Sequence, residues 1–326
     1  MDLRRRRFLR LSGAAALASL SRSARAQNWP TRNIRLVVGY APDGGLDSAA
    51  HILGNRLSEI WGQRVIIEST SGNDVRIAFD AVAHAAPDGH TMLTATGAPE
   101  VNRFLFSKLT FDPAVDFTPV SLIGTFPDIL VVSSSSPLDS VEKFIAFAKS
   151  RPGMLSWASP GTGTPPHLAG ELFKLMAGIK MTHVPYDGIT EYLISDLVAG
   201  RVDAMFDTAG SLLPLVRSHQ LRGLAVTSGK RFPNQPELPT VAESGVPGYD
   251  VSSWYGLYLP ARTPPEVVRT INSDIVVLLR DSALKAQFAA LAILVASSRP
   301  EELAARNSAA AGAWKSLIEV ANIKVE

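Results

Sequence analysis

The chain has 326 residues, a formal net charge of +2 at neutral pH and no cysteine. The lack of cysteine excludes disulfide scaffolds, cysteine-ligated zinc, iron–sulfur clusters, thiol catalysis and a lipid anchor on cysteine. With 46% hydrophobic and 19% charged residues, the composition is that of a globular chain with a sizeable core. The length fits one large domain or two ordinary ones.

The first 26 residues have the pattern of a secretory signal peptide. Four consecutive arginines begin at Arg4, a short apolar run follows over 11–20, and residues 24–26 (Ala-Arg-Ala) form an A-x-A-like cleavage site. The segment 5–10 (RRRFLR) is similar to the twin-arginine motif, and an ordinary Sec signal with a basic start is the alternative. We expect cleavage near Ala26 and a periplasmic mature protein.

Removing this segment changes the charge of the protein. Residues 1–26 hold seven arginines and one aspartate, so the rest of the chain has 25 basic and 29 acidic residues, a net charge of −4. The usual electrostatic basis for binding nucleic acid or an anionic membrane is therefore missing. No later segment approaches the ~18 consecutive apolar residues of a membrane-spanning helix, so we expect no membrane insertion.

The first part of the mature chain alternates strand and helix patterns. Apolar, β-rich runs predict strands over 34–38, 64–68 and 91–95. Helical patterns follow the first strand, ending near residue 61, and cover 77–85. This β-α-β-α-β order indicates a parallel sheet with helices on both faces.

A second α/β unit follows. Strands are predicted over 129–133, 155–158, 181–185, 202–206 and 221–227. Helices are predicted from Ser140, as the N-cap, to 150, over 165–177 with proline at its start, and over 190–199.

The C-terminal segment is mostly helical. One strand over 255–259 precedes a helix from 264–265 to 280, a second capped by Ser282, and a third from 300 to about 321. One strand with three helices makes a poor independent domain, so we expect this segment to return to the first unit.

The predicted fold class is therefore α/β with two lobes. Lobe 1 takes 27–126 plus 229–326, and lobe 2 takes 127–228. Two chain crossings, near 124–130 and 225–230, would form a hinge, and hinged lobes close around a ligand in a central cleft. The alternative is two tandem domains without a functional cleft.

Small-residue loops follow the predicted strands at 41–47, 95–98, 159–164 and 207–210. In open α/β sheets ligands bind at this carboxyl edge, where exposed N–H groups and positive helix ends suit an anion. Ordinary tight turns are the alternative. The predicted ligand-binding residues are Tyr40, Asp43, Gly44, Gly45, Asp47, Thr96, Gly97, Ser159, Gly161, Thr162, Gly163, His167, Tyr186 and Asp207. Within this set we expect Ser159, Thr162 and the amides of Gly161 and Gly163 to grip one end of the ligand, opposite the Gly44–Gly45 loop.

Motifs for catalysis, metals or cofactors fail on inspection. The segment 161–163 lacks the third glycine of a dinucleotide fingerprint, and 223–231 has the wrong spacing and an arginine in place of the P-loop serine or threonine. There is no G-x-S-x-G elbow and no H-E-x-x-H. The six histidines are scattered, with only His167 near a candidate loop. We therefore expect no catalytic residue, metal or cofactor, and we interpret Trp254-Tyr255 as core packing.

Many collinear motifs are shared with one known family. They are WPTR at 29–32, the loop at 42–47, APDGHTML at 86–93, DFTPVSL at 116–122, PHLAGELF at 166–173, HVPY at 183–186, GRVDAMFD at 200–207, residues 221–228, PTVAESG at 239–245 and WYGL at 254–257. On these motifs the chain resembles the Bug, or TctC-like, solute receptors of tripartite tricarboxylate transporters, over essentially the whole mature length.

This resemblance implies a type II periplasmic-binding fold and a small carboxylated ligand, held by loop amides and hydroxyls and partly through water. It also implies the membrane subunits of a transporter as partners. We expect a monomer. Two other functions stay open: an enzyme using the same cleft, for which no nucleophile–base pair is readable, and a signalling receptor, which would share the fold.

The chain departs from the family pattern at three acidic residues. Asp43 and Asp74 stand where the resemblance implies glycine, and Asp187 where it implies a basic residue. An unpaired carboxylate beside a ligand carboxylate costs several kcal/mol at low dielectric. Either these side chains point away from the cleft, or the ligand carries an amine, an amide or a ring nitrogen in place of a second carboxylate.

Overall fold

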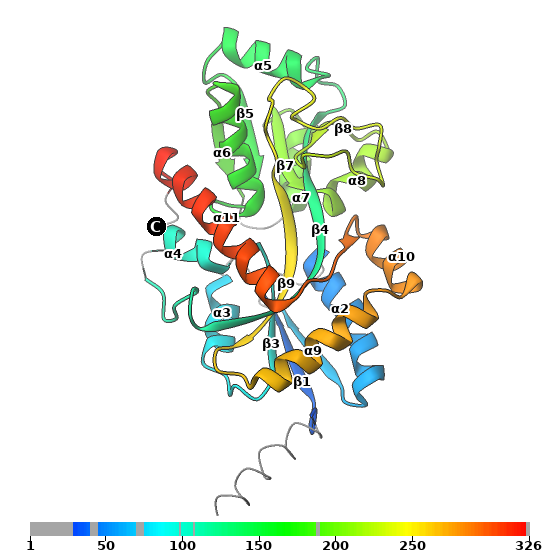
Figure 1. The fold of residues 1–326 in the computed structure, drawn as a ribbon. Helices are drawn as coiled ribbons and strands as arrows, with labels where there is room; N and C mark the ends of the chain where they lie inside the picture. The colour runs from blue at the N-terminus through cyan, green and yellow to red at the C-terminus, as the bar shows by residue number, and fades with distance from the viewer. Residues whose placement is uncertain are drawn as a thin grey trace, which may run out of the picture.

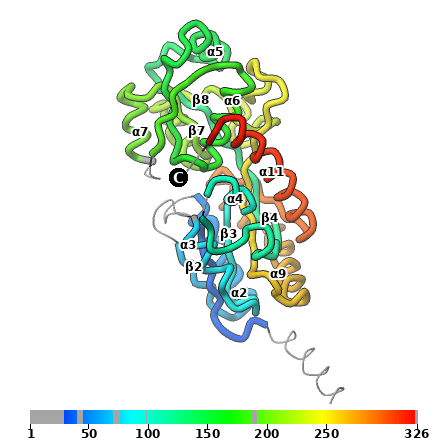
Figure 2. The backbone as a smooth tube through the Cα atoms, turned by 90° about the vertical axis from the view of Figure 1, so that its left-hand side faces the viewer, coloured from blue at the N-terminus to red at the C-terminus, as the bar shows by residue number. Residues whose placement is uncertain are grey.

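The computed structural model describes residues 29–39, 45–69, 75–97, 99–106, 108–186 and 190–323. Two lobes lie one above the other in both views (Figures 1 and 2), and the helix drawn in red runs from one to the other. The predicted signal peptide lies outside the described residues, and so do Tyr40, Asp43, Gly44, Asp74 and Asp187.

Lobe 1 is built on one half of the sheet. Strands β1 (Ile34–Val38), β2 (Val65–Ser69) and β3 (Thr91–Thr96) are parallel, with β1 in the middle. Strand β9 (Ser252–Pro260) runs antiparallel beside β3. The three strands for which the sequence predicts a parallel sheet are parallel, and the addition of β9 makes the sheet mixed.

Lobe 2 carries the other half of the sheet. Strand β5 (Ser156–Ser159) lies parallel between β6 (Thr182–Pro185) and β7 (Ala204–Thr208). Strand β8 (Leu221–Val226) completes this half. Within the described residues the strand order is β2-β1-β3-β9-β4-β7-β5-β6, with β8 and β10 (Leu294–Val295) paired to β4.

Strand β4 (Phe117–Ser133) joins the two halves. Its residues 117–127 pair with β9, and 128–133 pair with β7 and β8. The strand changes partners at Asp128, whose backbone is held by Thr227: the Asp128 amide donates to Thr227 Oγ1 over 2.9 Å, and the Thr227 amide donates to the Asp128 carbonyl over 3.0 Å. This crossing lies where the sequence predicts the first of the two hinge segments.

Helices cover both faces of each half-sheet. In lobe 1, α2 (Gly45–Trp61), α9 (Pro265–Leu278) and α10 (Ser282–Ala290) contribute to one core, and α3 (Val75–Ala83), α4 (Asn102–Leu105) and α11 (Pro300–Val320) to the other, with the 3-10 turn η1 (Pro99–Val101) before α4. In lobe 2, α5 (Val141–Ser150) and α6 (Pro165–Ala177) pack on one face, and α7 (Thr190–Val198) and α8 (Ala209–Arg217) on the other. Alternating side chains explain this: Leu130 and Val132 of β4 enter one lobe 2 core, Ile129 and Val131 the other.

Some helix ends differ from the sequence prediction. Ser140 is the N-cap of α5 as expected, since its side chain accepts from the Lys143 amide. The cap of α10 is Asp281, whose carboxylate accepts from the Leu284 amide, and not Ser282. No helix in the described part of the chain is both long enough and apolar enough to cross a membrane.

The segment after β8 packs on lobe 2. Phe232 and Leu238 belong to one of its cores, and Val241, Tyr249 and Val251 to the other. We therefore propose that the chain returns to lobe 1 near Ser252, where β9 begins, in place of the expected crossing at 225–230.

A close approach between α6 and β5 gives a stability prediction. A Cβ added at Gly170 would lie 2.3 Å from the Trp157 ring, and Trp157 is fully buried. We expect Gly170→Ala to lower the free energy of unfolding by about 1–3 kcal/mol, the usual cost of overpacking. Gly312→Ala is the control, because an added Cβ at this helical position meets nothing within 4 Å and alanine favours helix by up to ~1 kcal/mol. Chemical denaturation of both variants checks this, and equal stabilities would contradict it.

Candidate ligand-binding site

The β5–α6 loop has a fixed shape set by its own hydrogen bonds. The Gly161 carbonyl accepts from the Thr164 hydroxyl over 2.7 Å and from its amide over 3.3 Å. Gly163 has a φ of +82°, which favours glycine. Because residues 165 and 166 are both proline, the first two positions of α6 offer no N–H group. Any amide that faces an anion at this helix end must therefore come mainly from the loop.

Two of the predicted amide donors are engaged inside the protein. The Gly163 amide donates to His167 Nδ1 over 3.0 Å, and the Gly161 amide makes a long contact of 3.4 Å to Ser159 Oγ. Among the described residues, Thr162 has no protein hydrogen-bond partner for its amide or hydroxyl. The grip predicted for this loop therefore rests on Thr162 more than on the glycine amides.

The neutral ring of His167 holds the β5–α6 loop through its hydrogen bond to Gly163. Burial, with His183 and Lys174 nearby, lowers the pKa of His167 to about 3. Since Nδ1 accepts from Gly163, the proton of the neutral ring sits on Nε2. The ring stacks on Trp157 at 5.7 Å and lies 4.2 Å from the His183 ring. His167 thus positions the loop and presents no acceptor to the cleft.

Ser159 is fixed by the second histidine. Its Oγ lies 2.8 Å from His183 Nε2, and its side chain is fully buried. Burial and the nearby Lys174 ammonium lower the pKa of His183 to about 4. Both histidines are therefore neutral over the physiological pH range, and Ser159 has a partner whether or not a ligand is bound.

On lobe 1, α2 begins directly at Gly45. A Cβ added there would lie 3.1 Å from Tyr255 Oη, so the backbone comes close to β9. Asp47, in the first turn, is buried and accepts from the Ser69 hydroxyl at the end of β2. A carboxylate in the first turn is attracted to the positive end of the helix dipole, so Asp47 stabilises the start of α2.

The end of β3 is tied to β9. The Gly97 amide donates to the Trp254 carbonyl over 2.9 Å, and Tyr258 Oη donates to the Gly97 carbonyl over 3.3 Å. Gly97 has a φ of +67°, which a residue with a side chain rarely adopts. These bonds hold Gly97 against β9.

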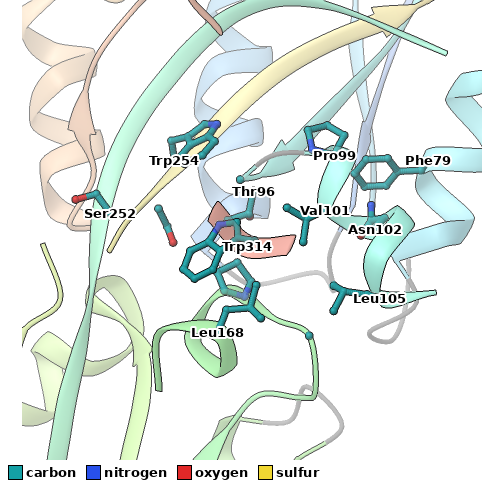
Figure 3. A pocket seen from close by; sticks show the side chains of 14 residues that line it. Phe79, Thr96, Pro99, Val101, Asn102, Leu105, Leu168, Ser252, Trp254 and Trp314 are labelled. Carbon is teal, nitrogen blue, oxygen red and sulfur yellow. The ribbon is translucent and has the colours of Figure 1, made fainter. Parts of the chain in front are cut away.

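A pocket between the lobes brings three of the predicted residues together, namely Thr96, Gly97 and Gly163. Its lobe 1 side adds Phe79, Pro99, Val101, Asn102 and Leu105; its lobe 2 side adds Pro165 and Leu168; Ser252, Ser253, Trp254 and Trp314 complete the wall. Figure 3 shows Trp314 in the middle of this group, with Leu168 below it and Trp254 above.

Two other predicted residues point to different partners. Tyr186 Oη donates to the Asp196 carboxylate, and burial with this bond raises the pKa of Tyr186 to about 12. Asp207 is buried and accepts from the Thr208 amide over 2.6 Å. Among the described residues, neither of them lines the pocket.

Sequence reasoning missed the apolar wall of this pocket. Trp254 is buried, as its interpretation as a core residue implies, and it also lines the pocket. Trp314 and Leu105 carry no signal in the sequence, because their helices come from distant parts of the chain. Within the described residues no cluster of three or more histidine or acidic side chains could hold a metal ion.

Comparisons with known proteins assign the family. Residues 49–321 match the model described as "Tripartite tricarboxylate transporter family receptor". The chain belongs to this family. It is thus one of a family of transporter receptors, not of enzymes.

Solved structures agree on the fold. A protein of R. palustris solved with adipate is 35% identical, with a TM-score of 0.83 over 90% of this chain and 99% of that one. The periplasmic binding protein BugD is 28% identical, with a TM-score of 0.80 over 91% and 100%. MatC from Rhodopseudomonas palustris, with bound malate, is 30% identical, with a TM-score of 0.78 over 89% and 100%. The TctC-family chain therefore has the mixed α/β fold of periplasmic binding proteins, as predicted.

Proposed function

We propose that this TctC-family receptor captures a small organic carboxylate between its two lobes and delivers it to the membrane subunits of a tripartite transporter. The observation that carries the proposal is the pocket between the lobes, which joins the end of β3 to the start of α6. Relatives of the same fold bind adipate and malate. The signal-peptide pattern supports a periplasmic location.

The carboxylate is proposed to lie at the β5–α6 loop. The amide and hydroxyl of Thr162 are available donors, and the positive end of α6 lies behind them. Gly45, at the positive end of α2, is proposed to approach the ligand from lobe 1. Both helix ends favour an anion, although neither places a full positive charge in the site.

The way the lobes are joined supports closure around the ligand. Strand β4 changes partners at Asp128, and we propose that β9 carries the return crossing. Two adjacent strands that connect two half-sheets form a hinge that can bend without breaking either core. We expect the lobes to come together when the ligand binds both faces of the cleft.

Small-angle scattering of the purified periplasmic protein with and without adipate or malate tests this function. The radius of gyration should fall on binding. The NMR spectrum of the ligand released from the protein should be that of the unreacted ligand. Saturating binding with an unchanged radius would contradict closure. Turnover of the ligand would favour the enzyme alternative.

A further inference from the structure

The pocket between the lobes is mostly apolar. Val101 and Leu105 from lobe 1, Leu168 from lobe 2 and Trp254 from β9 are all at most 7% exposed. Trp314 of α11 also lines it. Among the described residues that line it, none carries a charge.

The polar side chains in this wall are few. Among the described lining residues they are Asn102, Thr96, Ser252 and Ser253, with the ring nitrogen of Trp314. A carboxylate moved from water into such a wall loses far more hydration than these neutral groups replace. An alkyl chain or a ring gains from leaving water, at roughly 25 cal/mol per Å² of buried apolar surface.

The pocket adjoins the loop that is proposed to hold the carboxylate, although Thr162 itself is not among the described residues that line it. It shares Gly163 with the β5–α6 loop and Thr96–Gly97 with the end of β3. A ligand with its carboxylate at Thr162 would therefore extend its remainder along this wall. Trp314 packs against core residues of both lobes, so a ligand that contacts it touches the element that spans the hinge.

We propose that this pocket receives the apolar body of the ligand, and that the protein selects a monocarboxylate with an alkyl or aromatic remainder over a dicarboxylate. This inference rests on the proposed function, because it needs a carboxylate at the β5–α6 loop. It adds the chemical class of the other end of the ligand.

Calorimetric titration with three matched ligands tests the proposal. Hexanoate has one carboxylate and an apolar chain, adipate replaces the terminal methyl by a second carboxylate, and hexanamide lacks the carboxylate. We expect hexanoate to bind at least about tenfold more tightly than adipate, because the second carboxylate would be desolvated without a partner. Hexanamide should bind at least about tenfold more weakly than hexanoate.

Each result separates the two claims. If adipate binds as tightly as hexanoate or more tightly, the inference is overturned and the proposed function stands. If hexanamide binds as well as hexanoate, the proposed carboxylate site falls, and the inferred selection of a monocarboxylate falls with it. If none of the three binds, both are overturned.

Two variants locate the effect in the pocket. Asn102 is half-buried at the start of α4, so Asn102→Arg should fold and place a cation in the wall. It should shift the preference toward adipate by about tenfold, whereas Asn102→Gln should leave the preference unchanged.

Trp314→Ala should weaken the affinity for hexanoate about tenfold. Trp61→Ala is the matched control, because Trp61 is half-buried and is not among the described residues that line the pocket. An unchanged preference in Asn102→Arg together with unchanged hexanoate affinity in Trp314→Ala would place the ligand body elsewhere.

Discussion

Replacing Asp128 by asparagine is expected to stabilise the protein at pH 8 and to have little effect at pH 5. The Asp128 side chain is fully buried, and neither of its carboxylate oxygens has a hydrogen-bond partner among the described residues. Burial, with the Asp207 carboxylate nearby, raises the pKa of Asp128 to about 8. In the unfolded chain an aspartate has a pKa of about 4.

The sign follows from proton binding. Between pH 4 and pH 8 the folded state holds a proton on Asp128 that the unfolded state has lost, so stability falls as pH rises through this range. Each pH unit in this range lowers the free energy of unfolding by about 1.4 kcal/mol. Because relaxation of the site reduces the total, we expect the free energy of unfolding to fall by about 2–4 kcal/mol between pH 5 and pH 8. Asparagine has no charge to bury and avoids this loss.

Thermal unfolding of the variant and the natural protein at pH 5, 6.5 and 8 measures the effect. The Tm difference should grow to roughly 5 °C or more at pH 8. Comparison at the same pH cancels the contributions of His167 and His183. Glu301→Gln, at an exposed position of α11, is the control and should show the same Tm difference at each pH. A gain for Asp128→Asn that does not depend on pH would contradict the buried, protonated carboxyl.

Gly45→Val is expected to weaken ligand binding roughly 10- to 100-fold, the scale of 1–3 kcal/mol for overfilling a packed site. The new Cβ would lie 3.1 Å from Tyr255 Oη, and its methyl groups would occupy space at the helix end that is proposed to approach the ligand. The residue stands at the first position of α2, so the helix itself should persist.

Titration with a carboxylate that binds the natural protein checks this prediction, together with thermal unfolding to show that the variant is folded. Gly312→Val is the matched control, because its surroundings are open. Unchanged affinity in a folded Gly45→Val protein would move the lobe 1 contact away from α2.

The elements that sequence reasoning placed best are those with local signals. Thr164 and Pro165 mark the start of α6, and the predicted end at Ala177 is also correct. Strand β1 was predicted with its observed ends, because its apolar residues alternate between two cores. In these segments the local pattern and the tertiary packing favour the same structure.

Proline gave the opposite signal in two elements, so that only 129–133 of strand β4 is predicted and helix α8 is not predicted at all. Strand β4 extends back to Phe117 although Pro119 and Pro127 lie within it, and its register shifts near Pro119. Helix α8 contains Pro214. Proline usually indicates the end of a strand or helix, and only the packing of these segments against both neighbours overrides it.

Part of the lining of the pocket follows from the sequence. The topology puts Thr96, Gly97 and Gly163 in loops at strand ends, and these three residues line one pocket. Trp314 of α11 lines the same pocket, although it lies about 150 residues after Gly163 in the chain. No local pattern predicts that these residues meet. The selective role of Asp43, Asp74 and Asp187 stays a prediction, because these residues lie outside the described part of the chain.

Calorimetric titration of the purified periplasmic protein tests the central claim most directly. The ligands are adipate, malate and hexanoate, each compared with the amide in which every carboxylate is replaced (the diamide for adipate and malate). The account predicts that at least one carboxylate binds with one-to-one saturation, and that its amide binds at least about tenfold more weakly, because the helix ends and loop donors favour an anion. Binding of no carboxylate, or equal binding of carboxylate and amide, would contradict a carboxylate receptor.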